Sequence, residues 1–354
     1  MAKVAAAGGQ SSVAGLCIVR APVIRITWTQ SYLKLREIAR MWNCVLTVAL
    51  VVVSCRGALG QDAERYLIVH ADDAGMSHSV NMATIAGLES GIVSSASIMV
   101  PCPWFSEFAD YARQHPEYDY GIHLTLNAEW KHYRWGPVAS RDRVPSLVDK
   151  NGFLWDNVSQ VAANVRAEEV EIELRAQIDR AISFGVPLSH LDTHMGALFS
   201  RPDLVEVYAR LGLDYDLPVL FLRRIDGAVA REYPGLKEGA AALVRTLDAH
   251  GLPLLDHIAQ FYGGDTHEQR TASYYKSIRS LPPGVSELII HCGFDNDELK
   301  AITNSAARRD GDRRIFTSET TRQLLQDENI RLLTWKQFRQ QVADRPPASP
   351  AENE

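Results

Sequence analysis

Eight short runs of apolar and often β-branched residues recur between residues 66 and 335, and segments with helical periodicity separate most of them. The runs are "YLIVH", "SSASIMV", "YGIHLTL", "LSHLDTH", "PVLFLR", "LLDHIAQF", "SELIIHC" and "IRLLTW". One intervening segment predicts a helix that ends at Gly212 and buries one face, made of Leu204, Val207, Tyr208 and Leu211. Strands that alternate with helices indicate a parallel sheet, and about eight such units favour an α/β fold with a single β/α-barrel-like domain.

An open, doubly wound sheet is the alternative architecture. No GxGxxG or Walker pattern opens the first predicted helix, so the commonest reason to prefer that alternative is missing. The chain has 354 residues, of which 46% are hydrophobic and 23% charged, as is typical of a globular protein with a large core. We therefore expect one domain over residues 61–340, followed by a proline-rich, disordered tail over residues 341–354.

The net charge and the cysteines exclude several classes of protein. A formal net charge of -6 without a basic stripe argues against nucleic acid as a partner. The five cysteines form no CxxC pair and follow no regular spacing, so neither a disulfide framework nor a zinc knuckle is indicated. Only Cys102 and Cys292 fall within the expected domain.

Residues 1–60 are expected to form a leader for export. An apolar run at residues 45–53 has the length of a signal-peptide h-region, and small residues follow it. Cleavage after Gly60 would give a periplasmic or secreted soluble protein, whereas acylation of Cys55 in "VVSC" would give a lipid-anchored one. The stretch before Met41 is long for an n-region, so Met41 is an alternative start of translation. The intact mass of the mature protein from its native host distinguishes these forms.

Polar side chains stand at the ends of several predicted strands. They are Asp72 and Asp73 after the first run, His123 in the third, His194 at the end of the fourth and His291 at the end of the seventh. In a β/α barrel the carboxyl ends of the strands form the active-site face, so these side chains are expected to lie together. A single histidine in an apolar strand is usually a core residue, but three at matching positions favour a metal site. Two imidazoles and one carboxylate are typical ligands of a catalytic divalent ion.

Four motifs in these runs resemble, in order, those of the YdjC-like carbohydrate deacetylases, of which chitooligosaccharide deacetylase is the best-known member. "HADDAG" is similar to the opening motif of that family, "GIHLTL" to the second, "SHLDTH" to the third and "IIHCG" to its His-Pro-Gly. The resemblance covers about residues 66–335 and implies a β/α-barrel-like fold. Two positions depart from the family pattern: Gly196 stands where another histidine is common, and Cys292 replaces the usual proline.

The resemblance also implies roles for individual residues. Asp73, His123 and His194 would hold the metal ion, and Asp72 would act as the general base. The substrate would be an N-acetylated sugar or oligosaccharide, from which water removes the acetyl group. Among divalent ions, a set of imidazole and carboxylate ligands favours Zn²⁺, with Mg²⁺ as the alternative.

This chemistry explains why two aspartates stand side by side. A bound divalent ion lowers the pKa of water towards ~7 and stabilises the oxyanion, so one carboxylate binds the metal while a second takes the proton of the attacking water. Gly75 would permit a turn with positive φ that brings both side chains to one cavity. His291 is the candidate acid for the departing amine, and Asp192 is a candidate to orient a ligand histidine. The alternative interpretation of the two aspartates is a strand end followed by a helix cap.

The loop after His123 contains three aromatic residues, Trp130, Tyr133 and Trp135, which would either contact a sugar or pack as a lid over the rim of the barrel. Two other functions stay open. One is a metal-dependent barrel enzyme of another class, such as an aldolase, an isomerase or a hydrolase of a different bond, which would release no acetate from an N-acetyl sugar. The other is a non-catalytic exported carbohydrate-binding protein, whose degenerate site would hold no stoichiometric metal.

Overall fold

The computed structural model describes residues 64–225, 227–233, 236–261, 263–264 and 266–344. The predicted leader, with Met41 and Cys55, lies outside these residues, as does the predicted tail from residue 345 onwards. No helix in the described part of the chain is long and apolar enough to cross a membrane. The cysteines of the described part, Cys102 and Cys292, are buried free thiols.

Within the described ranges, seven parallel strands form one sheet. Its order is β4-β3-β2-β1-β6-β5, and β7 pairs with the first residues of β1. The strands are β1 (Arg65–Ala74), β2 (Ser95–Ile98), β3 (Tyr120–Leu124), β4 (Leu188–Thr193), β5 (His257–Gln260), β6 (Gly284–Ile290) and β7 (Ile330–Leu332). Each of them lies within or overlaps one of the predicted runs.

An extended segment, residues 218–223, closes the sheet into an irregular barrel. On one side the backbone N–H of Leu220 donates to the carbonyl oxygen of Leu191 in β4 at 2.8 Å. On the other side the N–H of Arg223 donates to the carbonyl oxygen of Leu255, just before β5, at 2.8 Å. This segment is the predicted "PVLFLR" strand, but it pairs only through isolated bridges. The predicted barrel-like fold is therefore confirmed in an irregular form.

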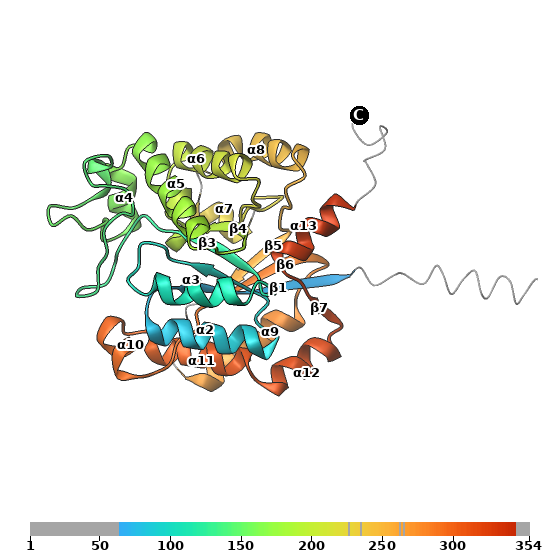
Figure 1. Ribbon diagram of the computed structural model, residues 1–354. Coiled ribbons are helices and arrows are strands. Elements are labelled where there is room, and N and C mark those ends of the chain that lie inside the picture. The colour runs from blue at the N-terminus through green and yellow to red at the C-terminus, as the bar shows by residue number, and fades with distance from the viewer. Residues whose placement is uncertain (1–63, 226, 234–235, 262, 265, 345–354) are drawn as a thin grey trace, which may run out of the picture. The chain divides into compact units, whose positions relative to one another are not determined.

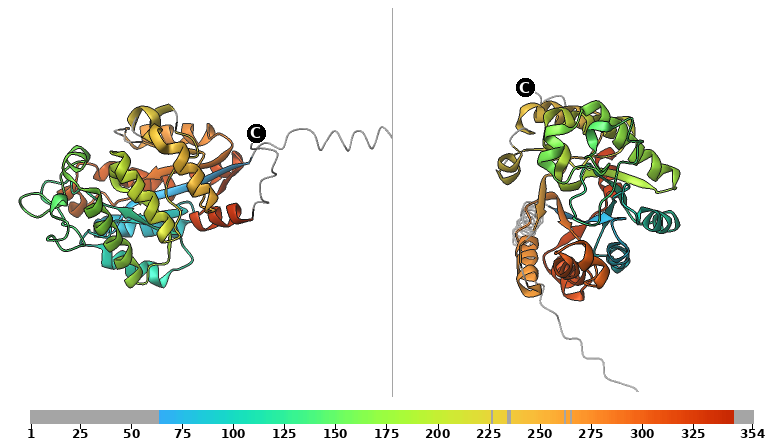
Figure 2. Two further views of the ribbon diagram at one scale, coloured as in Figure 1. Left: turned by 90° about the horizontal axis from the view of Figure 1, so that it is seen from above. Right: turned by 90° about the vertical axis from the view of Figure 1, so that its left-hand side faces the viewer.

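Helices cover both sides of the sheet (Figure 1), and the two further views show the same arrangement (Figure 2). In Figure 1, α5, α6 and α8 lie above the strands and α2, α3 and α11 below them, while α13 lies at the end where β1 begins. The helices are α2 (His78–Ser90), α3 (Phe105–Gln114), α4 (Val158–Asn164), α5 (Ala167–Ser183), α6 (Pro202–Asp214), α7 (Gly227–Glu232), α8 (Lys237–Ala249), α9 (His267–Arg279), α10 (Asp297–Ile302), α11 (Ala306–Phe316), α12 (Glu319–Asp327) and α13 (Trp335–Ala343), with short 3₁₀ turns η1 (Pro145–Leu147) and η2 (His194–Phe199). Residues 341–343, at the start of the predicted tail, thus belong to α13.

Local sequence signals set several helix ends. Ser77 caps α2 by accepting a backbone N–H, and Gly91 ends this helix with a φ of 73°. The prediction that Gly212 ends α6 is wrong, because the helix continues to Asp214. Gly212 instead makes room for the closing segment: a Cβ at this position would lie 2.5 Å from Cγ1 of Val219.

Alternate residues of β1 face the outside and the inside of the barrel, as strand geometry requires. Leu67 and Val69 belong to the core that packs against the outer helices. Ile68 belongs to a second apolar core, which it shares with residues of β6, the closing segment and α13. His70 and Asp72 continue the row of Ile68 and are 0% and 5% exposed. The inside of the barrel is therefore apolar where the strands begin and polar towards their carboxyl ends.

Candidate metal centre

Asp72 and Asp73 reach the same cavity because the end of β1 is irregular. In a regular strand, adjacent side chains point to opposite faces. The pairing of β1 with β2 shifts register near its end, and Asp73 has a positive φ of 69°. Gly75 follows with a φ of 88°, as expected from the sequence. Ser77, and neither aspartate, caps the helix that follows.

The structure brings the five polar residues predicted at the strand ends to one cavity at the carboxyl face of the barrel. The volume of this cavity is about 840 Å³, and its lining combines these polar groups with apolar side chains of the closing segment. The five residues are Asp72, Asp73, His123, His194 and His291. The cavity is therefore large enough for a small organic substrate and is polar at one end.

Three of these residues could hold a metal ion, because ligand atoms of Asp73, His123 and His194 lie within 4.8 Å of one another. Oδ1 of Asp73 lies 3.4 Å from Nε2 of His123 and 3.3 Å from Nδ1 of His194. This oxygen is buried and makes no hydrogen bond within the described part of the chain. A buried carboxylate oxygen that faces two imidazole nitrogens without a hydrogen bond fits a divalent cation.

In His123 and His194, the ring nitrogen that does not face Asp73 faces another carboxylate. Nδ1 of His123 lies 2.8 Å from Oδ1 of Asp192, and Nε2 of His194 lies 3.2 Å from both oxygens of Glu129. Carboxylates favour a protonated nitrogen opposite them, so the nitrogens that face Asp73 are the ones that would bind a metal ion. Asp192 thus lies where an orienting residue is needed. Glu129 was not predicted, because it belongs to no motif and lies in the loop after β3.

Arg309 of α11 pairs with the second oxygen of Asp73. The distance from its Nη2 to Oδ2 of Asp73 is 2.5 Å, and the two residues are 236 positions apart in the sequence. Burial alone would raise the pKa of Asp73, but Arg309, His123 and His194 outweigh burial and hold this pKa well below its usual range. Asp73 is therefore a carboxylate at neutral pH. No pattern in the sequence marks Arg309, which lies among several arginines of α11.

Asp72 and His291 lie on the same side of the cavity. Nε2 of His291 is 3.8 Å from Oδ2 of Asp72, and the backbone N–H of His291 donates to Asp312 at 3.1 Å. Burial lowers the pKa of the His291 side chain below its ordinary value. The imidazole is therefore neutral at pH 7 and can accept a proton from a neighbouring group.

The three aromatic residues of the loop after β3 occupy different positions. Trp130 lines the cavity. Trp135 is only 3% exposed, and its ring lies edge-on to that of Trp130 with centroids 5.4 Å apart. Tyr133 packs on Trp135 and donates from its hydroxyl to the carbonyl oxygen of Met76. Of the three, Trp130 is thus placed to touch a ligand, whereas Tyr133 and Trp135 hold the loop against the barrel.

The structure shows what surrounds Gly196 and Cys292, the two positions that depart from the family pattern. Gly196 has a φ of 64°, and a Cβ there would lie 2.4 Å from the hydroxyl oxygen of Tyr233. Tyr233 therefore fills the space beside this glycine, at the edge of the cavity. Cys292 is fully buried, and burial raises the pKa of its thiol well above the ordinary value. It follows His291 in the chain but does not line the cavity.

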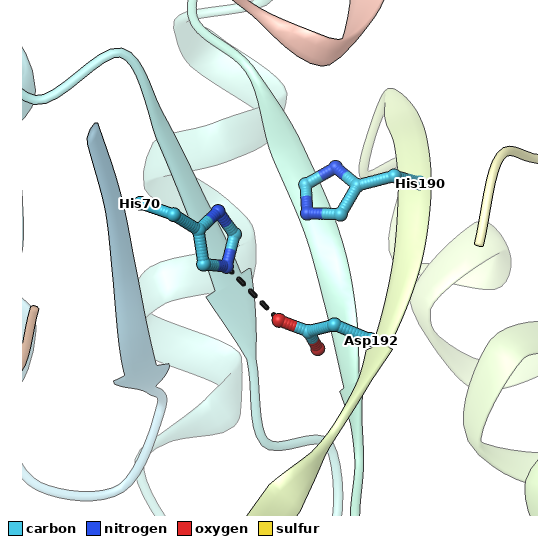
Figure 3. A group of neighbouring side chains, drawn as sticks. All are labelled: His70, His190 and Asp192. Carbon is cyan, nitrogen blue, oxygen red and sulfur yellow. Dashed lines mark hydrogen bonds and ion pairs between the residues drawn. The ribbon is translucent and has the colours of Figure 1, made fainter. Parts of the chain in front are cut away.

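A second group of histidine and aspartate lies deeper in the barrel. It consists of His70 from β1 with His190 and Asp192 from β4, which point towards one another in Figure 3. Nε2 of His70 lies 2.9 Å from Oδ2 of Asp192. The ring of His190 stands edge-on to that of His70 at 5.0 Å and stacks on Trp335 at 5.1 Å. His70 and His190 are 0% exposed and do not line the cavity, whereas Asp192 does; because its two histidines are enclosed, we call these three residues the sealed group.

Charges in the sealed group are set by burial and by a further carboxylate. Burial raises the pKa of Glu287 to about 8, and its Oε2 accepts a hydrogen bond from Nε1 of Trp335 at 3.0 Å. Burial would lower the pKa of His70, but Glu287 and Asp192 outweigh it and raise this pKa well above the ordinary value. The pKa of His190 is lowered by burial and by the nearby His70.

Comparisons with known proteins found a matching family model, similar relatives and a similar solved structure. A family model described as YdjC-like protein matches residues 66–327. The chain is 33% identical over 290 residues to a carbohydrate deacetylase of Thermus thermophilus, a match that covers 80% of this chain and 97% of the relative. It is 29% identical over 272 residues to a carbohydrate deacetylase of Thermoanaerobacter pseudethanolicus, covering 77% and 98%. A crystal structure from Enterococcus faecalis, provisionally described as a cellobiose-phosphate cleavage protein, aligns with a TM-score of 0.64 and 25% identity over 77% of this chain and 98% of that one.

Proposed function

The chain belongs to the YdjC-like protein family, and on that premise we propose that it is a metal-dependent deacetylase that removes the acetyl group from an N-acetylated sugar or oligosaccharide. The family match confirms the resemblance predicted from the four motifs. Relatives that align with most of the chain carry the name carbohydrate deacetylase. The observation that carries the proposal is the buried group of Asp73, His123 and His194, which opens onto the cavity.

Asp73, His123 and His194 would hold the metal ion. Two imidazoles favour Zn²⁺, and Mg²⁺ is the alternative. When bound, a divalent ion supplies a Lewis acid that lowers the pKa of water and stabilises the oxyanion formed during amide hydrolysis. Arg309 pairs with Oδ2 of Asp73 and so leaves Oδ1 to face the two histidines. Asp192 and Glu129 hold the rings of these histidines in the orientation that ligation needs.

Asp72 would accept the proton of the attacking water. Its side chain is buried beside Asp73 and lies outside the group of Asp73, His123 and His194, although Asp72 could itself hold an ion together with His123 and Asp192. The C–N bond then breaks, and the departing amine must gain a proton as acetate forms. His291 can supply it, because its neutral imidazole lies 3.8 Å from Asp72 and can pass the proton from this carboxyl group to the amine. Trp130 offers an aromatic face to the sugar ring at the cavity wall.

Acetate release from a panel of N-acetylated monosaccharides and oligosaccharides, combined with elemental analysis, tests the proposal. We expect about one divalent ion per chain and acetate release that stops after removal of the ion with a chelator and returns when it is restored. A protein that binds the ion but releases no acetate from any member of the panel would belong to another class of metal-dependent barrel enzyme. A protein without a stoichiometric ion and without turnover would be a carbohydrate-binding protein that has only kept the fold.

A further inference from the structure

We propose that His70, a residue of the sealed group, is a positioning residue. It holds two carboxylates in place: Asp72, the general base, and Asp192, which orients the ligand His123. This inference rests on the proposed function, in which Asp72 is the base and His123 a metal ligand. His70 does not touch the cavity and so cannot contact the substrate. It acts through Asp72 and Asp192, which lie on either side of its ring nitrogen.

A single atom of His70 faces three oxygen atoms. Its Nε2 lies 2.9 Å from Oδ2 of Asp192, 3.0 Å from Oγ of Ser97 and 3.2 Å from Oδ1 of Asp72. Two of these oxygens belong to carboxylates, which accept and do not donate when ionised. Nε2 must therefore carry a proton, because an unprotonated nitrogen would oppose both carboxylates in a buried place. His70 thus supplies the positive end of an N–H bond between two acceptors.

Asp192 connects His70 to His123, a candidate metal ligand. Asp192 uses Oδ2 for His70 and Oδ1 for Nδ1 of His123 at 2.8 Å. Nε2 of His123 in turn faces Asp73 at 3.4 Å. The base and the ligand are therefore connected through two shared groups, His70 and Asp192. Movement of His70 would release both Asp72 and the carboxylate that sets the ring of His123.

Water cannot take the place of His70 without opening the barrel. The residue is 0% exposed, and its 3.2 Å contact with Oδ1 of Asp72 is an ion-pair contact, because this oxygen makes no hydrogen bond within the described part of the chain. An apolar side chain at position 70 would leave the carboxylates of Asp72 and Asp192 without the N–H that lies between them. Two buried acceptors without a donor repel each other and rearrange, which would move the base away from its position.

His190 is a matched control for His70. Both histidines are 0% exposed, and their rings lie 5.0 Å apart. Nε2 of His190, however, has no hydrogen-bond partner among the described residues, and its Nδ1 contacts Ser189 at 2.8 Å. Its ring packs on Trp335 and against Gly121, whose Cβ, if present, would lie 2.3 Å from Nε2. Replacing His190 therefore tests packing in the same layer without removing a contact to Asp72.

The experiment compares His70→Leu, His70→Gln and His190→Leu with the wild type. We expect His70→Leu to lower kcat for acetate release by roughly 10- to 100-fold and to weaken Zn²⁺ affinity, measured by competition with a chelator, by about 10-fold, with KM within about threefold. His70→Gln should recover most of both losses, since its amide nitrogen can donate near the position of Nε2. His190→Leu should stay within about threefold of the wild type in kcat and in Zn²⁺ affinity.

The outcomes separate this inference from the proposed function. Equal losses in His70→Leu and His190→Leu, or a His70→Gln protein no better than His70→Leu, would overturn the role of His70. If His70→Leu lacks a cooperative unfolding transition, His70→Met replaces it in the same comparison. A wild type that releases no acetate would overturn the proposed function, whereas the Zn²⁺ affinities of the variants would still decide whether His70 orients the site.

Discussion

The barrel contains two layers of histidine and aspartate that are similar in composition and different in surroundings. The outer layer, Asp73, His123 and His194, faces the cavity, and Oδ1 of its aspartate makes no hydrogen bond in the described structure. In the inner layer, His70, His190 and Asp192, the two histidines are fully buried away from the cavity, and the aspartate already accepts hydrogen bonds with both oxygens. The same residue types therefore stand in two settings: the three residues of the outer layer line the cavity, whereas the two histidines of the inner layer do not.

The inner layer also shows what supports a metal site of this kind. Buried polar groups are costly unless they are hydrogen-bonded, and Asp192 meets this demand with both of its oxygens, although Nδ1 of His70 and Nε2 of His190 have no hydrogen-bond partner among the described residues. Asp192 belongs to the inner layer and touches the outer one, which makes it the structural connection between them. We therefore expect substitutions in the outer layer to change metal binding and turnover, and substitutions in the inner layer to change mainly stability, apart from those at His70 and Asp192.

The largest effect is expected for Asp73→Asn. A neutral amide is a poor ligand for a hard cation, so the bound metal and acetate release should both fall to background. Asparagine tolerates positive φ as aspartate does, so the backbone turn at this position should be kept. Elemental analysis of the purified variant measures the loss, with His194→Ala as a second ligand variant. Full metal content in both proteins would place the ion elsewhere.

Asp72→Asn should have a smaller effect of a different kind. The variant should keep its metal and lose roughly 10²- to 10⁴-fold in kcat, which is the usual contribution of a positioned acid or base. Elemental analysis and steady-state kinetics on the same sample give both values. Equal loss of metal in the Asp72 and Asp73 variants would mean that the two aspartates form one joint ligand set, and that the base is another residue.

The smallest of these effects concerns the inner layer and its dependence on pH. Glu287 has a pKa of about 8 in the folded protein against 4.5 as its ordinary value. Between these values the folded protein keeps a proton that the unfolded chain releases, so the free energy of unfolding should fall as the pH rises from about 5 to about 8. At roughly 1.4 kcal/mol per pKa unit, this loss amounts to a few kcal/mol.

Glu287→Gln should flatten this dependence, because the amide has no proton to release. Urea unfolding at several pH values measures the slope for the wild type and the variant. Glu319→Gln is the matched control, since the side chain of Glu319 is 82% exposed and its substitution should leave the slope unchanged. A slope that is the same in all three proteins would show that Glu287 is ionised in the folded state at neutral pH.

The sequence predicted the outer layer better than its supports. Asp72, Asp73, His123, His194 and His291 could be found because parallel strands bring their carboxyl ends together, so polar residues at those ends must share one face. The period of two along a strand could also have indicated His70, which lies two residues before Asp72 on the same face of β1. No such rule applies to Glu129 in a loop or to Arg309 on α11, because only tertiary packing brings them to the site.

In the fold, too, the regular features could be predicted from the sequence and the irregular ones could not. Alternating strands and helices were enough to predict the parallel barrel, because this connection has few alternatives. Closure by residues 218–223 through isolated bridges was not predictable, since the same "PVLFLR" run fits a full strand. Gly212 gave a misleading helix end for a related reason: its role is close packing against Val219, a contact that local sequence does not reveal.

The position of α13 has a consequence for folding during synthesis. Trp335, its first residue, is fully buried, stacks on His190 and donates to Glu287, and the adjacent β7 pairs with the first residues of β1. The inner layer is thus completed by a segment that the ribosome adds long after β1. Until that segment has emerged and docked, the histidines and carboxylates of this layer are hydrated, and the barrel is open where its strands begin. Folding of this domain therefore cannot finish strand by strand during synthesis, because the inner layer stays incomplete until α13 has docked.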